Sequence, residues 1–228
     1  TVNGNTHIDK VTLNALKIVE FSGLTHIPVV QGAALPLIEP LRQNPMGHGN
    51  SGLDGPQLPQ PTTRLHPGTA AQFIVETLMA HDKVTLVPVG PLTNIALALR
   101  LEPRIADHID EISLMGGSTT VGNSAPAAET NIAIDPEAAH IVFTSGIPIK
   151  MAGLNITRQA LSTPERMERI YALPGQTARV AAALLDWYNA KSKAAWGIPG
   201  AAIHDAVSVA WLVDASLVES VKAHVDIE

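Results

Sequence analysis

His204 and Asp205 are adjacent near the end of the chain, and their types suit acid–base and metal chemistry. An imidazole with an ordinary pKa of about 6.5 can donate a proton near neutrality. A carboxylate is a ligand for a hard cation, which also accepts backbone carbonyl oxygens. Alone, each residue is better explained structurally, His204 as a hydrogen-bonded side chain and Asp205 as an acidic residue favoured by a helix dipole. The pair gains meaning from the other polar clusters of the sequence.

Three other polar clusters follow apolar runs that we expect to be buried strands. They are Gly90-Pro91-Leu92-Thr93-Asn94, Met115-Gly116-Gly117, and Asn123 with Glu129-Thr130-Asn131. Glu129 and Asn131 share one face of extended backbone, and with Asn123 they can bind hydroxyl groups. The side chains of Asn123, Glu129 and Asn131 could instead cap turns or helices. The backbone carbonyl of Thr93 could face a cation. Together, and in this order along the sequence, the polar clusters indicate a site that binds a polyhydroxylated ligand and a metal ion.

A long loop is expected from Asn44 to Pro61, a stretch rich in Gly, Pro, Asn and Gln. His48 lies within it and has glycine on both sides. Such a segment can move like an active-site lid and place an imidazole over the site. An ordinary surface loop is an equally good interpretation.

Strand and helix patterns alternate along the chain. Strands are expected at 27–30, 84–89, 112–115 and 148–152, with a period-2 strand at 221–227, and helices at 8–20, 69–79, 92–99, 136–143, from 164, at 176–191 and at 205–213. This alternation predicts an α/β fold with a mainly parallel open sheet flanked by helices. Without an internal repeat or linker, residues 1–228 form one expected domain, and its abrupt ends suggest truncation at both.

The composition excludes several classes of function. The net charge is −6 without a basic run, which argues against a nucleic-acid partner. There is no cysteine, no apolar run long enough to span a membrane and no signal peptide, so a cytoplasmic protein is expected. The segment from Gly116 to Asn123 lacks the lysine of a phosphate loop, and no G-x-G-x-x-G is present.

Taken in order, these motifs resemble those of the nucleoside hydrolases, or nucleoside N-ribohydrolases. The matching stretches are Thr1-Val2-Asn3-Gly4-Asn5, His48 to Gly55, Gly90 to Asn94, Met115-Gly116-Gly117, Gly122-Asn123, Ala128 to Asn131, Asp135 to Ala139 and His204-Asp205-Ala206. The loop from His48 to Pro56 is most similar to that of the pyrimidine-preferring branch. The resemblance implies a Rossmann-like nucleoside hydrolase fold.

The resemblance also implies calcium-dependent hydrolysis of the N-glycosidic bond of ribonucleosides. It assigns the Thr93 carbonyl and the Asp205 carboxylate as calcium ligands. It assigns the ribose to a set of five residues, namely Asn5, Met115, Asn123, Glu129 and Asn131. His204 and His48 help the base to leave, and the enzyme is a homodimer or homotetramer.

Two departures from the family pattern keep other interpretations open. The family's Asp-rich motif, which supplies further calcium ligands and the base, would precede Thr1, and Thr130 replaces the usual aromatic residue. A catalytically incomplete nucleoside- or ribose-binding module is therefore the alternative. A sugar-binding protein of periplasmic type is a third possibility, although the order of the motifs argues against it.

Overall fold

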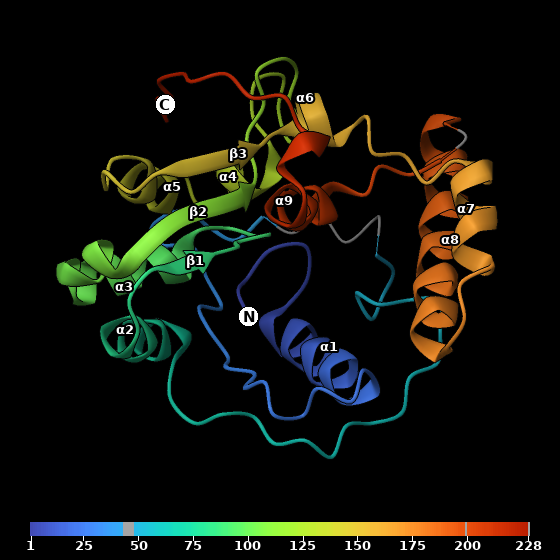
Figure 1. The fold of residues 1–228 in the computed structure, drawn as a ribbon, viewed down its shortest axis with the longest axis horizontal. Helices are drawn as coiled ribbons and strands as arrows, with labels where there is room; N and C mark the ends of the chain where they lie inside the picture. Colours follow the sequence, from blue (N-terminus) through green and yellow to red (C-terminus); the bar gives the residue numbers. More distant parts are fainter. Residues whose placement is uncertain (43–47, 199, 228) are drawn as a thin grey trace.

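A three-stranded parallel sheet organises the chain. The computed structural model describes residues 1–42, 48–198 and 200–227 (Figure 1). In the described part, β1 (Val84–Leu86), β2 (Ile109–Met115) and β3 (Ile149–Ala152) pair in the order β1-β2-β3. Because all three strands run in the same direction, their carboxyl ends meet at one edge, where ligands of such sheets bind. The predicted α/β class is confirmed.

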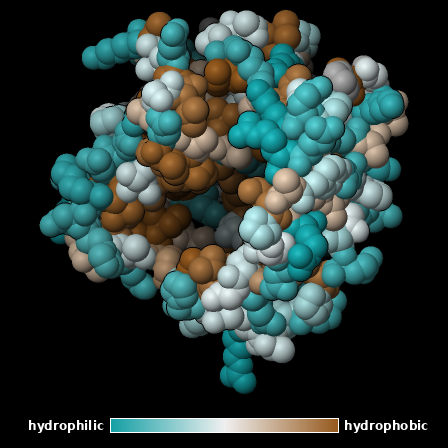
Figure 2. All heavy atoms as spheres, turned by 45° about the vertical axis from the view of Figure 1, so that its right-hand side comes forward, coloured by the Kyte–Doolittle hydropathy of each residue, from teal (hydrophilic) through white to brown (hydrophobic). Residues whose placement is uncertain are grey.

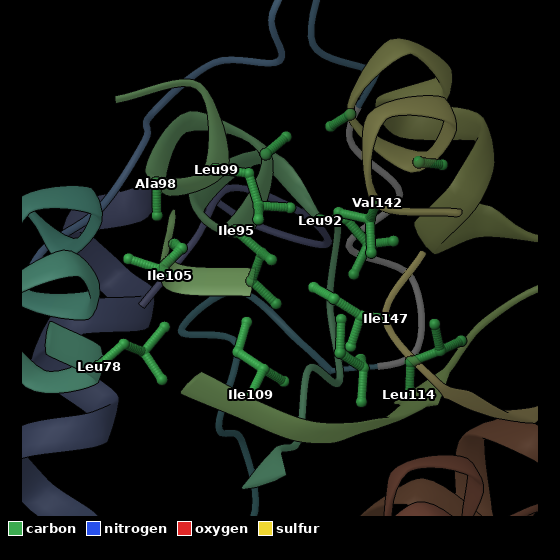
Figure 3. Close-up of a cluster of buried hydrophobic side chains, with 14 residues drawn as sticks. Leu78, Leu92, Ile95, Ala98, Leu99, Ile105, Ile109, Leu114, Val142 and Ile147 are labelled. Carbon is green, nitrogen blue, oxygen red and sulfur yellow. The ribbon is translucent and has the colours of Figure 1, made fainter. Parts of the chain in front are cut away.

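Helices cover both faces of the sheet. Ile112 and Leu114 of β2 point into a core that it shares with α3 (Thr93–Leu101) and α5 (Pro136–Phe143), and Leu78 of α2 (Ala70–Ala80) joins them (Figure 3). Ser113 lies between these two residues and points the other way, since side chains alternate along a strand. Its hydroxyl donates to the carbonyl of Ser208 at 2.9 Å in α9 (His204–Val213). Thus α9 covers the opposite face.

The remaining helices surround this centre. They are α1 (Ile8–Phe21), α4 (Thr130–Ile134), α6 (Leu154–Thr157), α7 (Pro164–Tyr171), α8 (Gln176–Trp196) and the 3-10 turns η2 (Pro103–His108) and η3 (Ala215–Leu217). In Figure 1, α7 and α8 lie side by side at the end of the molecule opposite α3. No helix in the described ranges has both the length and the apolar character needed to cross a membrane.

Capping residues fix where several helices begin. The Thr69 side chain accepts from the Gln72 amide, and the Gln72 side chain accepts from the Thr69 amide, which forms a capping box. Asp135 accepts from the Ala138 amide at the start of α5, directly before Pro136. Thr163 caps α7 in the same way. The expected Asp-Pro helix start and the cap before residue 164 are confirmed.

Two strand predictions were wrong, and a third was too long. At 27–30 there is only an isolated bridge between Val30 and His66. The apolar run at 84–89 stays in the sheet only to Leu86, because Pro88 has no N–H to donate to a neighbouring strand. Residues 221–227 alternate in polarity but form no strand, since the described residues provide no strand for them to pair with.

Candidate functional site

A cleft of about 520 Å³ opens between the N-terminal segment, the start of α1 and the residues that follow β1. Its polar lining includes Asn5, Asn14, His48 and Asn131, and its apolar lining includes Val11, Ile74, Leu86, Val87 and Val89. Figure 2 shows a hollow in the surface whose walls carry many hydrophobic side chains. The cleft therefore offers amide groups for a polar ligand beside apolar surface. Of the predicted site residues, it brings together Asn5, His48 and Asn131.

The end of β2 and the start of α4 form one hydrogen-bonded unit. Glu129 is the N-cap of α4, and its carboxylate accepts from the amides of Asn131 at 2.9 Å and Gly117 at 3.1 Å. The side-chain amide of Asn131 donates to the Met115 carbonyl at 3.0 Å. The predicted residues Met115, Glu129 and Asn131 therefore meet. The capping alternative is also correct for Glu129, which serves both purposes.

Two carboxylates lie close enough for the charge of one to act on the other. Glu129 is 2% exposed, and burial raises its pKa against the lowering effect of four backbone amides. Asp205 keeps an open surface, but the protein around it, and then the charge of Glu129, raise its pKa to about 6. Removal from water and a like charge both disfavour ionisation. A cation bound between the two groups would relieve this repulsion.

Both predicted histidines lie close to this pair. Burial lowers the pKa of His204, and the charges of Arg158 and His48 lower it further. The protein around His48 lowers its pKa as well, although part of the ring stays open to solvent. His48 stacks on Tyr188 of α8 with ring centroids 5.5 Å apart. The charge of Asp205 contributes to the raised pKa of Tyr188, so these rings and Asp205 belong to one neighbourhood.

Two residues that the motif analysis left out of the site contact these histidines. Nδ1 of His204 lies 2.7 Å from the hydroxyl of Thr157 in α6, and Tyr188 carries the ring beneath His48. Neither belongs to a cluster of polar residues after a strand. Thr157 does follow the apolar strand β3 at the same sheet edge, and this position is the signal that could have indicated it.

Thr93 and Asn123, like Met115, Glu129, His204 and Asp205, are not among the residues that line the cleft. The Thr93 hydroxyl donates to Asp135 at 2.6 Å, and Thr93 is buried. The Asn123 side-chain oxygen accepts from the amide and the hydroxyl of Thr130, both at 2.9 Å. The side chain of Asn123 thus closes its own loop, as the turn interpretation predicts. These contacts leave the calcium and ribose roles of the two residues as proposals.

The loop that carries His48 is anchored in its described part. Asp54 accepts from the amides of Asn50 at 2.9 Å and Ser51 at 3.1 Å. Lys10 donates to the Asn50 carbonyl at 2.5 Å, and Asn14 donates to that of Ser51 at 2.9 Å. The loop therefore lies on α1 beside the cleft. Asn44 to Gly47, which the predicted lid includes, lie outside the described residues.

The donor groups near Asp205 suit a hard cation. They include the carboxylate oxygens of Glu129 and Asp205, and oxygen is the ligand atom that calcium prefers. Together the two carboxylates place negative charge where a cation could bind. Within the described ranges, no group of three or more His, Asp or Glu side chains is placed to hold a metal ion. These side chains alone therefore supply only part of the six to eight oxygens, roughly, that calcium takes.

The fold and the site are those expected of a hydrolase with an α/β fold, because carboxylates can stabilise a positively charged sugar and imidazoles can donate a proton to a leaving group. The model of the inosine-uridine preferring nucleoside hydrolase family matches residues 1–228, and the chain belongs to this family. It is a nucleoside hydrolase, and the predicted family membership is confirmed.

Relatives and solved structures agree with this assignment. The chain is 45% identical to the pyrimidine-specific ribonucleoside hydrolase RihA of Shewanella oneidensis, over the whole chain and 72% of the relative. It is also 45% identical to RihA of Photobacterium profundum, over the whole chain and 74% of that relative. The structure of a purine-preferring ribonucleoside hydrolase from Gardnerella vaginalis superposes with a TM-score of 0.92 at 32% identity, covering 100% of this chain and 75% of that one.

Proposed function

We propose that this protein hydrolyses the N-glycosidic bond of pyrimidine ribonucleosides with a calcium ion bound beside Asp205. The preference for pyrimidines rests on the 45% identity to pyrimidine-specific relatives, against 32% for the purine-preferring structure. The observation that carries the reaction is electrostatic. Glu129 raises the pKa of Asp205, and His48 helps to lower the pKa of the neighbouring His204.

The amide and carboxylate groups hold the ribose. Asn5 and Asn131 line the cleft and offer both donors and acceptors to sugar hydroxyls. Glu129 is fixed by backbone amides, and its negative charge lies where the sugar becomes positive as the glycosidic bond breaks. A charge that is oriented before the reaction stabilises the transition state without reorganising. In this proposal Met115 and Asn123 complete the ribose side.

The two histidines act on the departing base. Their lowered pKa values leave the imidazoles largely neutral near pH 7, so that each ring carries one N–H. An imidazole N–H donates a hydrogen bond to the base as negative charge develops on it, and a protonated ring delivers a proton. His204 lies closest to Asp205 in the sequence, and His48 reaches the cleft from the loop above α1.

Calcium would be held by the Asp205 carboxylate and the Thr93 carbonyl, with further oxygens from the sugar and water. Such an ion anchors a sugar diol and makes bound water a better nucleophile. The repulsion that Asp205 experiences from Glu129 favours a cation at this position. We extend the proposal to a cytoplasmic homodimer or homotetramer, supported by the low charged fraction of 16%. Analytical ultracentrifugation tests the assembly.

The test is ribose release from uridine, cytidine and inosine, measured with calcium and with a chelator. We expect calcium-dependent release that is faster for the two pyrimidine nucleosides. Faster release from inosine would contradict the proposed preference for pyrimidines. Unchanged release with the chelator would contradict the proposed dependence on calcium. A folded protein that binds uridine in calorimetry but releases no ribose would support the alternative, a nucleoside-binding module.

A further inference from the structure

We propose that Thr157 is a positioning residue that holds the imidazole of His204 and fixes which of its nitrogens carries the proton. The inference rests on the proposed function, in which the His204 ring faces the departing base. Its physical basis is the 2.7 Å contact between the Thr157 hydroxyl and Nδ1 of His204.

The direction of this hydrogen bond follows from the surroundings of Thr157. Thr157 is fully buried, and in the described part of the chain its hydroxyl has His204 as its one hydrogen-bond partner. A buried hydroxyl proton without an acceptor is costly, so the hydroxyl donates to Nδ1. Nδ1 is then an acceptor, and the neutral ring carries its proton on Nε2. No other described residue hydrogen-bonds to the His204 ring, which leaves Nε2–H available to a ligand.

The segment around Thr157 is itself firmly held. The Thr157 amide donates to the Gly153 carbonyl at 3.0 Å, and the Leu154 amide donates to the Gly117 carbonyl at 2.9 Å. Gly117 is the residue whose own amide binds Glu129. The short helix α6 is thus tied to the end of β2 and, through it, to the carboxylate of the site. A support fixed in this way can hold a side chain in one orientation.

His204 is attached to the same segment through its backbone. The Ile203 amide donates to the Ala160 carbonyl at 2.8 Å, just before α9 begins with His204. The ring and the main chain of His204 therefore both depend on residues 153–160. Arg158 extends this support, because its guanidinium donates to the carbonyls of Val121 at 3.0 Å and Gly122 at 2.8 Å. The loop that carries Asn123 is thereby linked to the same helix.

The experiment compares Thr157→Val, which keeps the side-chain shape but removes the hydroxyl, with Thr157→Ser, which keeps the hydroxyl. In the complete natural protein we expect Thr157→Val to lower kcat for uridine about 10- to 100-fold, part of what general acid catalysis supplies, with little change in KM. Thr157→Ser should stay within roughly three-fold of the wild type, because it can donate the same bond. Thr144→Val, which removes an exposed hydroxyl that donates to the backbone carbonyl of His140, is the control and should leave kcat unchanged.

Two further measurements separate positioning from stability. Nitrogen-15 NMR of the histidine side chains, with the His204 signals identified by their loss in His204→Gln, should show the Nε2–H form in the wild type and a mixture of forms in Thr157→Val. Adding Thr157→Val to His204→Gln should cause no further loss of kcat. An unchanged His204 spectrum in Thr157→Val, or an independent loss in the double variant, would overturn the proposal. Full activity of His204→Gln would instead refute the proposed role of His204, while the spectra would still decide whether Thr157 holds the ring.

Discussion

Glu129 shows how one side chain can serve the fold and the chemistry together. It begins α4 by accepting from the amides of Asn131 and Ile132, and it reaches back to Gly117 at the end of β2. These bonds hold a buried carboxylate in one orientation. The same bonds oppose the pKa increase that burial causes, although burial is the larger effect and the pKa stays raised.

Glu129→Gln tests this double role. Glutamine keeps one oxygen that can cap α4 but removes the charge, so we expect kcat/KM for uridine to fall about 10²- to 10³-fold. The Tm should change by only a few degrees, roughly, since capping contributes about 1 kcal/mol. Thr163→Ala removes a cap of α7 and is the control, which should lower the Tm without altering kcat/KM. Equal kinetic effects in the two variants would assign Glu129 to capping alone.

At the proposed calcium site, Asp205 would make calcium binding depend on pH. Its folded-state pKa of about 6 lies above the ordinary value of 3.8, so the folded protein holds this proton more tightly than the unfolded chain. In metal-free protein the resulting stabilisation is present below the ordinary value and is lost as the pH rises through about 6. Calcium needs the deprotonated carboxylate, so its effect has the opposite dependence on pH.

The prediction is measured as the increase in Tm that calcium causes. We expect this increase to be larger at about pH 7.5 than at about pH 5, on either side of the Asp205 titration. Asp205→Asn should abolish the increase and raise the Tm of the metal-free protein at the higher pH, because the repulsion from Glu129 disappears. An Asp205→Asn protein that calcium still stabilises would exclude Asp205 as a ligand.

At the scale of elements, the loop from His48 to Asp54 determines how the cleft is closed on one side. The carboxylate of Asp54 accepts from the hydroxyl of Ser51, and this bond is the main cause of its lowered pKa. It also accepts from the amides of Ser51 and Asn50, which lower the pKa further. Glu20 uses the same device elsewhere and accepts from the amides and hydroxyls of Thr62 and Thr63. Of these two loops, only the one from His48 to Asp54 lines the cleft. A variant of Glu20 is therefore a matched control for a variant of Asp54.

Asp54→Ala should release the loop and raise KM for uridine about three- to ten-fold, because a less ordered loop costs entropy on binding. The kcat should fall as well, to the extent that His48 in this loop helps the base to leave, whereas Glu129 and His204 are held elsewhere. Glu20→Ala should loosen residues 62–63 and lower the Tm without affecting KM. A KM effect of equal size in both variants would mean that general loss of stability, not the cleft loop, is responsible.

The sequence predicts elements well where the signal is local. The cap at Asp135 and the apolar run of β2 depend on neighbours in sequence, and both are found as expected. Residues 27–30 and 221–227 have strand-like patterns, but a strand needs a partner that the pattern does not specify. Thr157 was missed for the same reason, because its significance comes from His204, 47 residues away. Pairings of this range depend on tertiary packing.

At the scale of the whole molecule, charge favours an uncharged substrate. The protein carries a net charge of −6, and none of the described residues that line the cleft is Lys or Arg. The carboxylate of Glu129, which accepts from the amide of the lining residue Asn131, lies near it. A 5′-phosphate would find no lysine or arginine side chain in this lining to offset its charge, whereas a nucleoside needs none.

We therefore expect uridine 5′-monophosphate to be hydrolysed at least about 100-fold less efficiently than uridine, the effect of a few kcal/mol of unfavourable electrostatics. For uridine itself, kcat/KM should vary less than about two-fold as sodium chloride is raised from about 0.05 to 0.3 M, because a neutral ligand is not steered by charge. Similar kcat/KM values for the nucleotide and the nucleoside would contradict this picture of the cleft.

The side chain of Asn94 joins parts of the chain that are remote in sequence. Its oxygen accepts from the Ala33 amide at 2.9 Å, and its nitrogen donates to the Thr1 carbonyl at 2.7 Å, across 93 positions. Gly32 permits this approach, since a Cβ there would lie within 2.4 Å of the Asn94 side chain. Contacts between positions distant in sequence form slowly during folding, because the chain loses the entropy of closing a long loop before the contacts can stabilise it. We therefore expect the segment that carries Asn5 to assemble late, so that a refolding chain acquires its secondary structure before it can bind a nucleoside.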